Sequence, residues 1–477
     1  MTTPTSTKEI INILTEFRQA VYTRIFQKRR DALFETLDAL LAGGTFASFA
    51  YLSQSERFQR QWPSLYAAVE DGQVDGEALR QLLIQQLPQD GICVFPLDGS
   101  SWPRPRSRVL EDLQYVYQAS SDVNGGNVTV GYPYSLLEWC AEPHTSWSLP
   151  LDVRRISGQQ TAQDVGVEQI QALAEARQAC LGALDIVAAD GKYGNGRFLS
   201  RVSGLRVGIV ARLRSDRVLY RPAEPTSGKR GCPPKYGERF GFKDEQTWGE
   251  PDEIQEFQDE NYGNVRLKRW NGLRDKRAPN LTFDILRAET HLEKDKPPAA
   301  VWFAWLPPLH PPAQIAITAQ IIWTAYVNRW PIEPGMRFRK ETLGWTLPRF
   351  QNAQTGDTWT QLVALAHWML FLARPLVQDN PLPWQKAQTR LTPQRVRQSL
   401  WTMLRQAQHR FSCRLEHPPS LPNCAENRLA GPKASPERPK NGSKWSKRAF
   451  LLPKPLEIQL VKCFATPDLP VREKWFV

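Results

Sequence analysis

Two aspartates stand where a carboxylate could do chemistry. Asp98 ends the apolar run ICVFPLD and Asp190 ends the run DIVAAD, and a glycine follows each of them. A carboxylate at the end of a buried strand is costly unless it is paired or binds a metal, and functional sites form at strand ends in α/β sheets. The alternative is that either aspartate is an ordinary turn or helix-cap residue before its glycine.

A third acid, Glu333, lies in the segment YVNRWPIEPGMRFRK with Tyr326, Arg329 and Lys340. At about 100° per residue, one continuous helix would present these four side chains within an arc of about 60°. A carboxylate there could bind Mg²⁺, while arginine and lysine could clamp phosphates. Ordinary ion pairs on a solvated helix face are the alternative.

The prolines of this segment allow a different local structure. Proline is tolerated only in the first turn of a helix, so the helix could begin near Pro331. Tyr326 and Arg329 would then precede the helix, and the argument from a shared face would fail for them.

Several cations accompany these three segments. They could position phosphates or simply keep the surface soluble; they are Arg104, Arg106, Arg108, Lys192, Arg212, Arg214, Arg337 and Arg339.

The elements that must hold these residues change along the chain. We expect five parts: a helical domain over 1–90, strands alternating with a helix over 91–214, a mostly β insertion over 215–300, a return of helical periodicity over 301–376, and a basic region over 377–477. Strands alternating with helices predict a mixed α/β sheet.

Composition limits the class of protein. The chain has 477 residues, of which 41% are hydrophobic and 23% charged, which is typical of a globular protein. No apolar run reaches the ~20 residues of a membrane helix, and the start lacks the features of a signal peptide. Seven cysteines without a C-x-x-C pair favour a reducing compartment over a zinc ribbon or a disulfide framework.

The charge is concentrated at one end. Residues 377–477 carry a net charge of +11, whereas the whole chain carries +12. Such a region indicates a polyanionic partner, most often nucleic acid, or else a merely solvated tail.

The motifs DGSSWPRP, AADGKYGN and Y-x2-R-x3-E-x6-K resemble those of DDE transposases of bacterial insertion sequences, in the superfamily with the YREK signature. The resemblance covers residues 91–376. It implies a ribonuclease-H-like fold in which Asp98, Asp190 and Glu333 are catalytic and bind two Mg²⁺ ions, or Mn²⁺ in their place. The implied activity is metal-dependent cleavage and strand transfer of DNA by a cut-and-paste mechanism.

The same resemblance implies the partners. They are the terminal inverted repeats of the element and the target DNA, bound by a homodimer in the cytoplasm, at the nucleoid, without a membrane. End recognition would fall to the helices of 1–90. Trp302 would stack on a flipped base, unless it is a core residue. The DNA contacts expected overall are Tyr326, Arg329, Lys340, Arg104, Lys192, Arg212, Arg337 and Trp302.

Two other functions remain open from the sequence. One is a different two-metal endonuclease on the ribonuclease-H-like fold. The other is a catalytically silent, domesticated transposase that only binds DNA. The YREK signature favours a transposase over the first, and the intact acids argue against the second.

Overall fold

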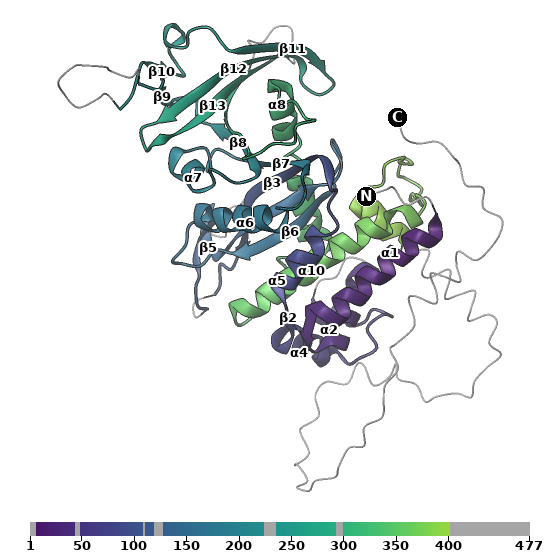
Figure 1. Ribbon diagram of the computed structural model, residues 1–477. Coiled ribbons are helices and arrows are strands. Elements are labelled where there is room, and N and C mark those ends of the chain that lie inside the picture. The colour runs from purple at the N-terminus through teal and green to yellow at the C-terminus, as the bar shows by residue number, and fades with distance from the viewer. Residues whose placement is uncertain are drawn as a thin grey trace, which may run out of the picture.

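The computed structural model describes residues 6–42, 48–107, 110–118, 127–223, 235–291 and 299–400. Most of the basic region, residues 401–477, therefore lies outside the described residues, as does Arg108. A sheet of twelve strands runs through the described part, with helices on both of its faces (Figure 1).

Five strands form the centre of this sheet. They are β3 (Asp90–Pro103), β5 (Val128–Cys140), β6 (Ser148–Arg155), β7 (Gly182–Ala189) and β8 (Val207–Leu213). Strand β5 is antiparallel to both β3 and β6, whereas β7 is parallel to β3 and β8 is parallel to β7. The order β6-β5-β3-β7-β8 with these directions is the ribonuclease-H-like arrangement, so the predicted fold class is confirmed.

Both faces of the central strands are covered, which explains their nearly continuous apolar sequences. Leu97 of β3 faces α6 (Ala162–Ala176), where a side chain on Gly166 would touch it. Val94, which points to the other face, packs against α8 (Ala319–Val327). Because side chains alternate along a strand, Asp98 shares the face of Val94 and α8.

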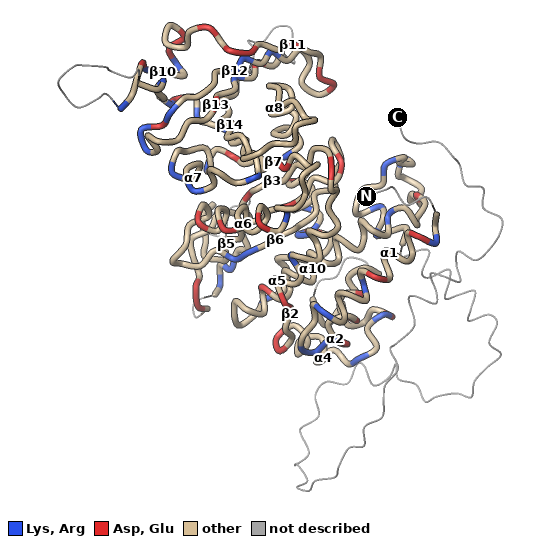
Figure 2. Tube along the Cα trace, in the orientation of Figure 1, with Lys and Arg blue, Asp and Glu red and all other residues tan. Residues whose placement is uncertain are grey.

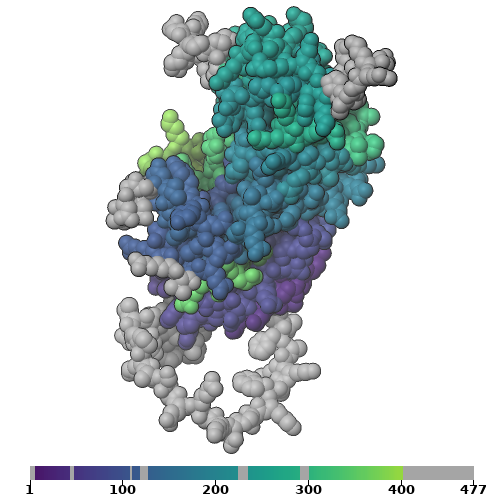
Figure 3. Space-filling view, turned by 90° about the vertical axis from the view of Figure 1, so that its left-hand side faces the viewer, coloured from purple at the N-terminus to yellow at the C-terminus, as the bar shows by residue number. Residues whose placement is uncertain are grey.

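The segment between β8 and the last strand is rich in β structure, as predicted. It holds β9 (Val218–Tyr220), β10 (Arg239–Gly241), the 3-10 helix η2 (Glu245–Thr247), β11 (Glu253–Asp259), β12 (Gly263–Asp275) and β13 (Ala278–His291). Strand β14 (Ala299–Leu306) pairs antiparallel with both β13 and β8. The insertion thus extends the central sheet, and its described residues, coloured teal, form the upper part of the molecule in Figure 3. The short strand β4 (Gln114–Tyr117) pairs with β5 at the other end.

The remaining helices of the core follow the strands. They are α7 (Gly196–Arg201), α9 (Ile332–Arg337), the π-helix η3 (Phe338–Thr342), α10 (Ala353–Ala373) and the 3-10 helix η4 (Arg374–Leu376). Helix α10 is apolar around its whole circumference, with Trp359, Leu365 and Trp368 all fully buried. Such a helix must be surrounded by protein.

The N-terminal elements supply much of that surrounding. They are α1 (Thr7–Ala20), the π-helix η1 (Val21–Ile25), β1 (Phe26–Lys28), α2 (Arg30–Ala42), α3 (Phe49–Leu52), α4 (Trp62–Asp71), β2 (Gln73–Val74) and α5 (Gly76–Ile84). Helices α1, α2 and α4 lie along α10 (Figure 1), and Phe49 contacts Trp359 with ring centroids 4.8 Å apart. The N-terminal helices and α10 therefore share one core.

The described start of the basic region also packs on this core. Arg397 donates from Nε to the carbonyl oxygen of Leu40 at 2.9 Å, and Arg395 pairs with Asp379. Both arginines are largely buried, so they serve packing rather than an exposed charged surface.

No helix among the described residues combines the length and apolar character needed to cross a bilayer.

Candidate active site

The two aspartates lie on adjacent parallel strands. Asp190 directly follows β7, as expected, whereas Asp98 lies within β3, which continues to Pro103, so the expectation that Asp98 ends its strand is wrong. Leu97 of β3 is in register with Ala189 of β7, and each is followed at once by an aspartate. Neighbouring strands are about 4.8 Å apart, so Asp98 and Asp190 lie next to each other at the point where β7 ends. Both are partly buried.

The carboxylate of Asp98 accepts hydrogen bonds from two donors. Its Oδ1 accepts the backbone N–H of Gly99 at 2.7 Å, and its Oδ2 accepts Nη1 of Arg329 at 2.8 Å. Asp190 accepts the backbone N–H of Lys192 at 3.0 Å. The backbone of β3 thus helps to fix Asp98, and the turn after β7 helps to fix Asp190.

Arg329 links these acids to the third. Its Nη2 lies 3.9 Å from Oε1 of Glu333, while its Nη1 donates to Asp98. Because both nitrogens belong to one planar group, Oδ2 of Asp98 and Oε1 of Glu333 are at most about 9 Å apart. Burial tends to lower the pKa of Arg329, but the charges of Asp98 and Asp190 outweigh it and raise the pKa.

The four signature residues do not share one helical face, so that expectation is wrong. Helix α8 ends at Val327, Arg329 lies in the turn that follows, and α9 begins at Ile332 after Pro331. Pro331 lies at the N-cap and Pro334 in the first turn, where proline is tolerated. The structure thus has the alternative geometry, in which a turn rather than a helix face brings Arg329 to Asp98.

A cleft of about 710 Å³ opens beside the acids. Asp190, Arg329 and Tyr326 line one part of it, and β8, β14 and the insertion line the rest. Its further cations are Arg212, Arg214 and Lys243, all exposed. Lys243 was not expected from the sequence, because it lies in a loop of the insertion that no motif marks.

Other predicted residues lie near the acids in different ways. Lys192 is exposed, and its Nζ lies where a Cβ on Gly99 would be only 3.1 Å away, so it borders β3 next to Asp98. The ring of Tyr326 packs at a tilt of 52° against that of Phe303, with centroids 4.4 Å apart, and faces Arg329. Lys340 lies in η3 with Nζ 5.9 Å from the ring centre of Trp345; burial and then the charge of Arg339 lower the pKa of Lys340.

Arg104 and Trp302 are both buried, although Trp302 also lines the cleft beside the acids. Arg104 is buried directly after β3, with its guanidinium 4.7 Å from the ring centre of Trp102. Trp302 is 3% exposed and stacks on Phe242 at 4.2 Å, which favours the core-packing alternative. Arg337 is exposed and lies 3.8 Å from Glu341 on the same helical segment, without a contact to the acids.

The chemistry of the donor set suits a divalent cation. Carboxylate oxygens are the ligands that Mg²⁺ and Mn²⁺ prefer, and the side chain of Glu333 is 59% exposed and free to turn. In the described part of the chain, however, no three acidic, histidine or cysteine side chains are grouped closely enough to hold a metal ion. Arg329 supplies the positive charge instead.

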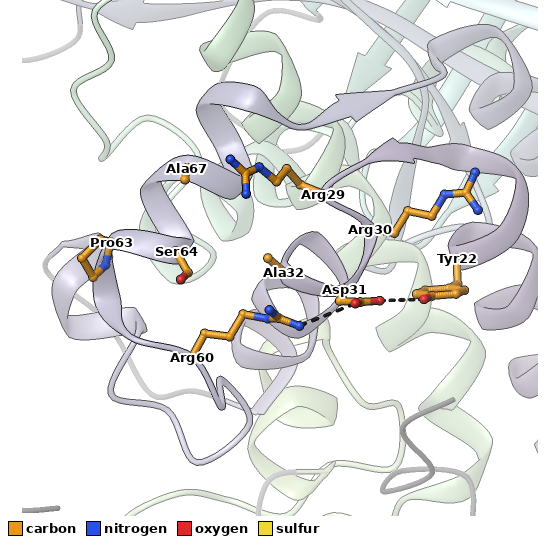
Figure 4. A pocket seen from close by; sticks show the side chains of 9 residues that line it. All are labelled: Tyr22, Arg29, Arg30, Asp31, Ala32, Arg60, Pro63, Ser64 and Ala67. Carbon is orange, nitrogen blue, oxygen red and sulfur yellow. Dashed lines mark hydrogen bonds and ion pairs between the residues drawn. The ribbon is translucent and has the colours of Figure 1, made fainter. Parts of the chain in front are cut away.

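A second pocket, of about 600 Å³, lies apart from these acids on the N-terminal helices. Arg29, Arg30 and Arg60 border it together with Ser64 (Figure 4). Arg29 pairs with Asp71, and Arg60 pairs with Asp31 and Glu35. Both signs of charge therefore alternate over these helices (Figure 2), and Arg30 alone of the three arginines has no ion-pair partner within the described residues.

Comparisons with known proteins name the family. The model for the DDE superfamily endonucleases matches residues 21–276, which is more than half of the chain. The chain belongs to this superfamily. The DDE match contains Asp98 and Asp190, whereas Glu333 lies beyond it. DDE endonucleases typically use divalent metal ions.

No curated protein matches the chain significantly. Among solved structures, the piggyBac transposase synaptic complex with hairpin DNA is similar, with 11% sequence identity and a TM-score of 0.38. The similarity covers 87% of this chain and 81% of that one.

Proposed function

We propose that this DDE endonuclease is a transposase that moves an insertion sequence by cutting and joining DNA. One observation carries the proposal: a single guanidinium, that of Arg329, contacts Asp98 and Glu333 and interacts with the charge of Asp190. Arg329 thus contacts two carboxylates from distant parts of the sequence and is influenced by the charge of a third. Acids arranged in this way are suited to hold cations next to a phosphodiester.

The carboxylates of Asp98, Asp190 and Glu333 would hold two Mg²⁺ ions, or Mn²⁺. When bound, such a pair stabilises the attacking and leaving oxygens of a displacement at phosphorus. The cations of the cleft, Arg212, Arg214 and Lys243, would hold the DNA backbone. Lys192 would hold a phosphate beside Gly99 of β3.

Arg329 has a role of its own in this proposal. Arginine binds carboxylate and phosphate with the same forked geometry, so its guanidinium can exchange Asp98 for a phosphate of the substrate. The position of Arg329 allows this exchange, because its side chain borders the cleft. The side chain is otherwise enclosed, with 15% of its surface exposed. Arg329 would thereby keep the acids together until DNA arrives.

DNA binding would be divided between the ends of the chain. The pocket of Arg29, Arg30 and Arg60 (Figure 4) supports a backbone contact by the N-terminal helices, which would recognise the terminal repeats. The basic region 377–477 would add affinity that does not depend on sequence. A homodimer would hold two transposon ends together, at the bacterial nucleoid in the cytoplasm.

A cleavage assay on DNA that carries the terminal inverted repeats of the element tests the proposal. We expect nicking at the repeat ends with Mg²⁺ and none with a chelator or with scrambled ends. Joining of the freed 3′ ends to target DNA would complete the evidence for a transposase. Cleavage of branched DNA without end preference would favour a different endonuclease on this fold, and specific binding without cleavage would favour a silent relative.

A further inference from the structure

A buried ionic cluster lies beneath the candidate active site. Glu138 of β5 forms an ion pair with Arg339 of η3, and their side chains are 0% and 3% exposed. Arg339 also donates from Nη1 to the carbonyl oxygen of Ser148 at 3.3 Å and lies 3.2 Å from Nδ1 of His367. The side chain of Arg339, which directly follows α9 in η3, is thus held by three neighbouring elements: β5, β6 and α10.

The cluster shares its face of the sheet with the acids. Asp98 is directly opposite Leu136 in the β3–β5 register, and Glu138 is two residues farther along β5. Side chains at i and i+2 of a strand point to the same face, so Asp98 and Glu138 are diagonal neighbours, with Cα atoms about 7–8 Å apart. The charge of Asp98 acts on Glu138 accordingly.

Two arginines therefore tie one segment to two acids of the sheet. Arg329 binds Asp98 and, ten residues later, Arg339 binds Glu138. Glu333 lies between them on α9. The outer contact borders the cleft, whereas the inner contact is enclosed by protein.

Gly335 brings α9 close enough for the inner contact. A Cβ at Gly335 would lie 3.3 Å from the carbonyl oxygen of Ser148 and 3.5 Å from Nη1 of Arg339. The missing side chain lets the helix backbone lie directly over the start of β6. Glycine at position 335 thus has a packing reason.

We propose that the Glu138–Arg339 pair is an anchor that positions Glu333 over Asp98 and Asp190. Stability alone does not account for it, because a buried ion pair is often no more stable than apolar residues of the same shape. It does fix one position of α9 on the sheet. The anchor also keeps Glu333 in place when Arg329 releases Asp98, because the inner contact is shielded from DNA and water. Arg339 lies in a π-helix, a feature frequent at functional sites.

The test compares two buried ion pairs of the same fold. The variant Glu138→Gln/Arg339→Gln removes the anchor without leaving an unpaired buried charge. The matched control is Asp185→Asn/Arg177→Gln, because Arg177 and Asp185 form an equally buried pair near the opposite ends of β3 and β7. Both pairs lie in the core, but only the first touches the segment of Glu333.

Hydrogen exchange of the full-length protein gives the first readout. We expect the amides of residues 332–342 to exchange about tenfold faster or more in the anchor variant, as a local opening. The rest of the core and the control variant should keep wild-type protection in that segment. Unchanged protection of 332–342, or an equal loss throughout the sheet, would overturn the proposal.

Cleavage kinetics give the second readout, which rests on the proposed function. We expect kcat of the anchor variant to fall by about 10- to 100-fold, the effect of a small misplacement of a reacting group, with KM close to wild type. The control should keep its kcat, and an equal fall in both would contradict positioning. If the wild type cleaves no DNA, the proposed function fails while hydrogen exchange still decides on the anchor.

If the double variant does not fold, Arg339→Lys replaces it. Lysine keeps the charge but not the planar fork that reaches Ser148 and His367. We expect an intermediate exchange rate in residues 332–342. A rate equal to wild type would show that the fork is dispensable and would refute the anchor as described.

Discussion

Arg329 forms ion pairs with Asp98 and Glu333, although most of its side chain is buried. Burial of a cation is costly unless acids compensate it, and here the acids raise the pKa of Arg329 despite its burial. In exchange, the guanidinium offsets the repulsion between carboxylates that would otherwise face one another. At this scale the site is an arrangement of balanced charges, and removing one charge should have a specific effect.

Asp98→Asn should abolish metal-dependent cleavage of terminal-repeat DNA. The amide keeps the shape of Asp98 but is a poor ligand for a hard divalent cation, whereas DNA affinity rests mainly on cation–phosphate contacts. Gel assays of cleavage and of binding on the same DNA measure both effects. Asp216→Asn is the control, because Asp216 lies in the same cleft but pairs with Arg214 at the surface. Metal-dependent cleavage by the Asp98 variant would refute its assignment.

Arg329→Ala should slow cleavage and weaken the complex with cleaved ends without loss of metal binding. Loss of a bidentate phosphate contact removes a strong charge-assisted interaction, but the carboxylates stay and repel one another, so Mn²⁺ affinity should be kept or increased. Calorimetric titration with Mn²⁺ and single-turnover cleavage measure the two effects. Arg201→Ala, which removes an exposed arginine paired with Asp164, should behave like wild type. A loss of Mn²⁺ binding in the Arg329 variant would contradict a phosphate role.

At the scale of elements, the segment from α8 to η3 is decisive because it is broken. In a continuous helix, Tyr326 and Arg329 would lie on the same helix as Glu333. Pro331 prevents such a helix, because proline is tolerated only in a first turn. Arg329, in the turn after α8, forms an ion pair with Asp98. Arg339, in the π-helix η3, forms an ion pair with Glu138. Helix α10 packs next to η3, where its fully buried His367 contacts Arg339.

His367 should make the protein less stable in mild acid. Burial, and then the charge of Arg339, hold the pKa of His367 well below its usual value of 6.5. The unfolded chain binds a proton near pH 6.5 that the folded chain does not bind, so the free energy of unfolding falls as the pH drops below 6.5. The slope is up to about 1.4 kcal/mol per pH unit for one such group. Denaturant titrations at pH 7.5 and pH 5.5 measure this loss.

The variant His367→Gln should show a smaller loss of stability between the two pH values, although glutamine can still accept from Arg339. The matched control is His310→Asn, since His310 is exposed and should leave the wild-type pH dependence unchanged. An identical pH dependence in wild type and His367→Gln would mean that the buried imidazole is not the cause.

At the scale of the molecule, the N-terminal helices, the central sheet and the insertion are joined through shared cores and one sheet (Figure 1). DNA bound at the cleft would therefore lie on a scaffold continuous with the N-terminal pocket.

We expect Arg30→Gln to weaken binding of the terminal repeats and to flatten the slope of log affinity against log salt by about 0.9, the value for one lost phosphate contact. Arg201→Gln should leave the slope unchanged, and an unchanged slope for Arg30→Gln would exclude the pocket as a DNA contact.

Deletion of residues 414–477 should also flatten this salt slope, because it removes 12 Lys and Arg residues. Each lost phosphate contact reduces the slope by about 0.9. Preference for the terminal repeats should survive, since phosphate contacts carry no base information. Fluorescence anisotropy at several salt concentrations, with specific and scrambled DNA, measures both quantities. Loss of preference would assign end recognition to this region instead of the N-terminal helices.

Local sequence determined much of this protein. The apolar runs before Asp98 and Asp190 predict buried strands, because burial and side-chain alternation follow from the types of neighbouring residues. Strand β7 ends before Asp190 as expected, whereas β3 continues past Asp98 to Pro103. The basic composition of residues 377–477 and the β-rich character of the insertion are also local properties. Family resemblance linked these segments to Glu333, which no periodicity could have related to the aspartates.

Tertiary structure decided what depends on contacts between distant residues. It set Asp98 beside Asp190 through the parallel register, broke the signature helix so that Arg329 reaches Asp98, and buried Trp302 against Phe242. It also paired Glu138 with Arg339 across 201 positions of the chain, and brought Lys243 from the insertion to the cleft. Helical spacing describes neighbours along one element, whereas a turn, a register and a buried ion pair arise only when several elements pack together.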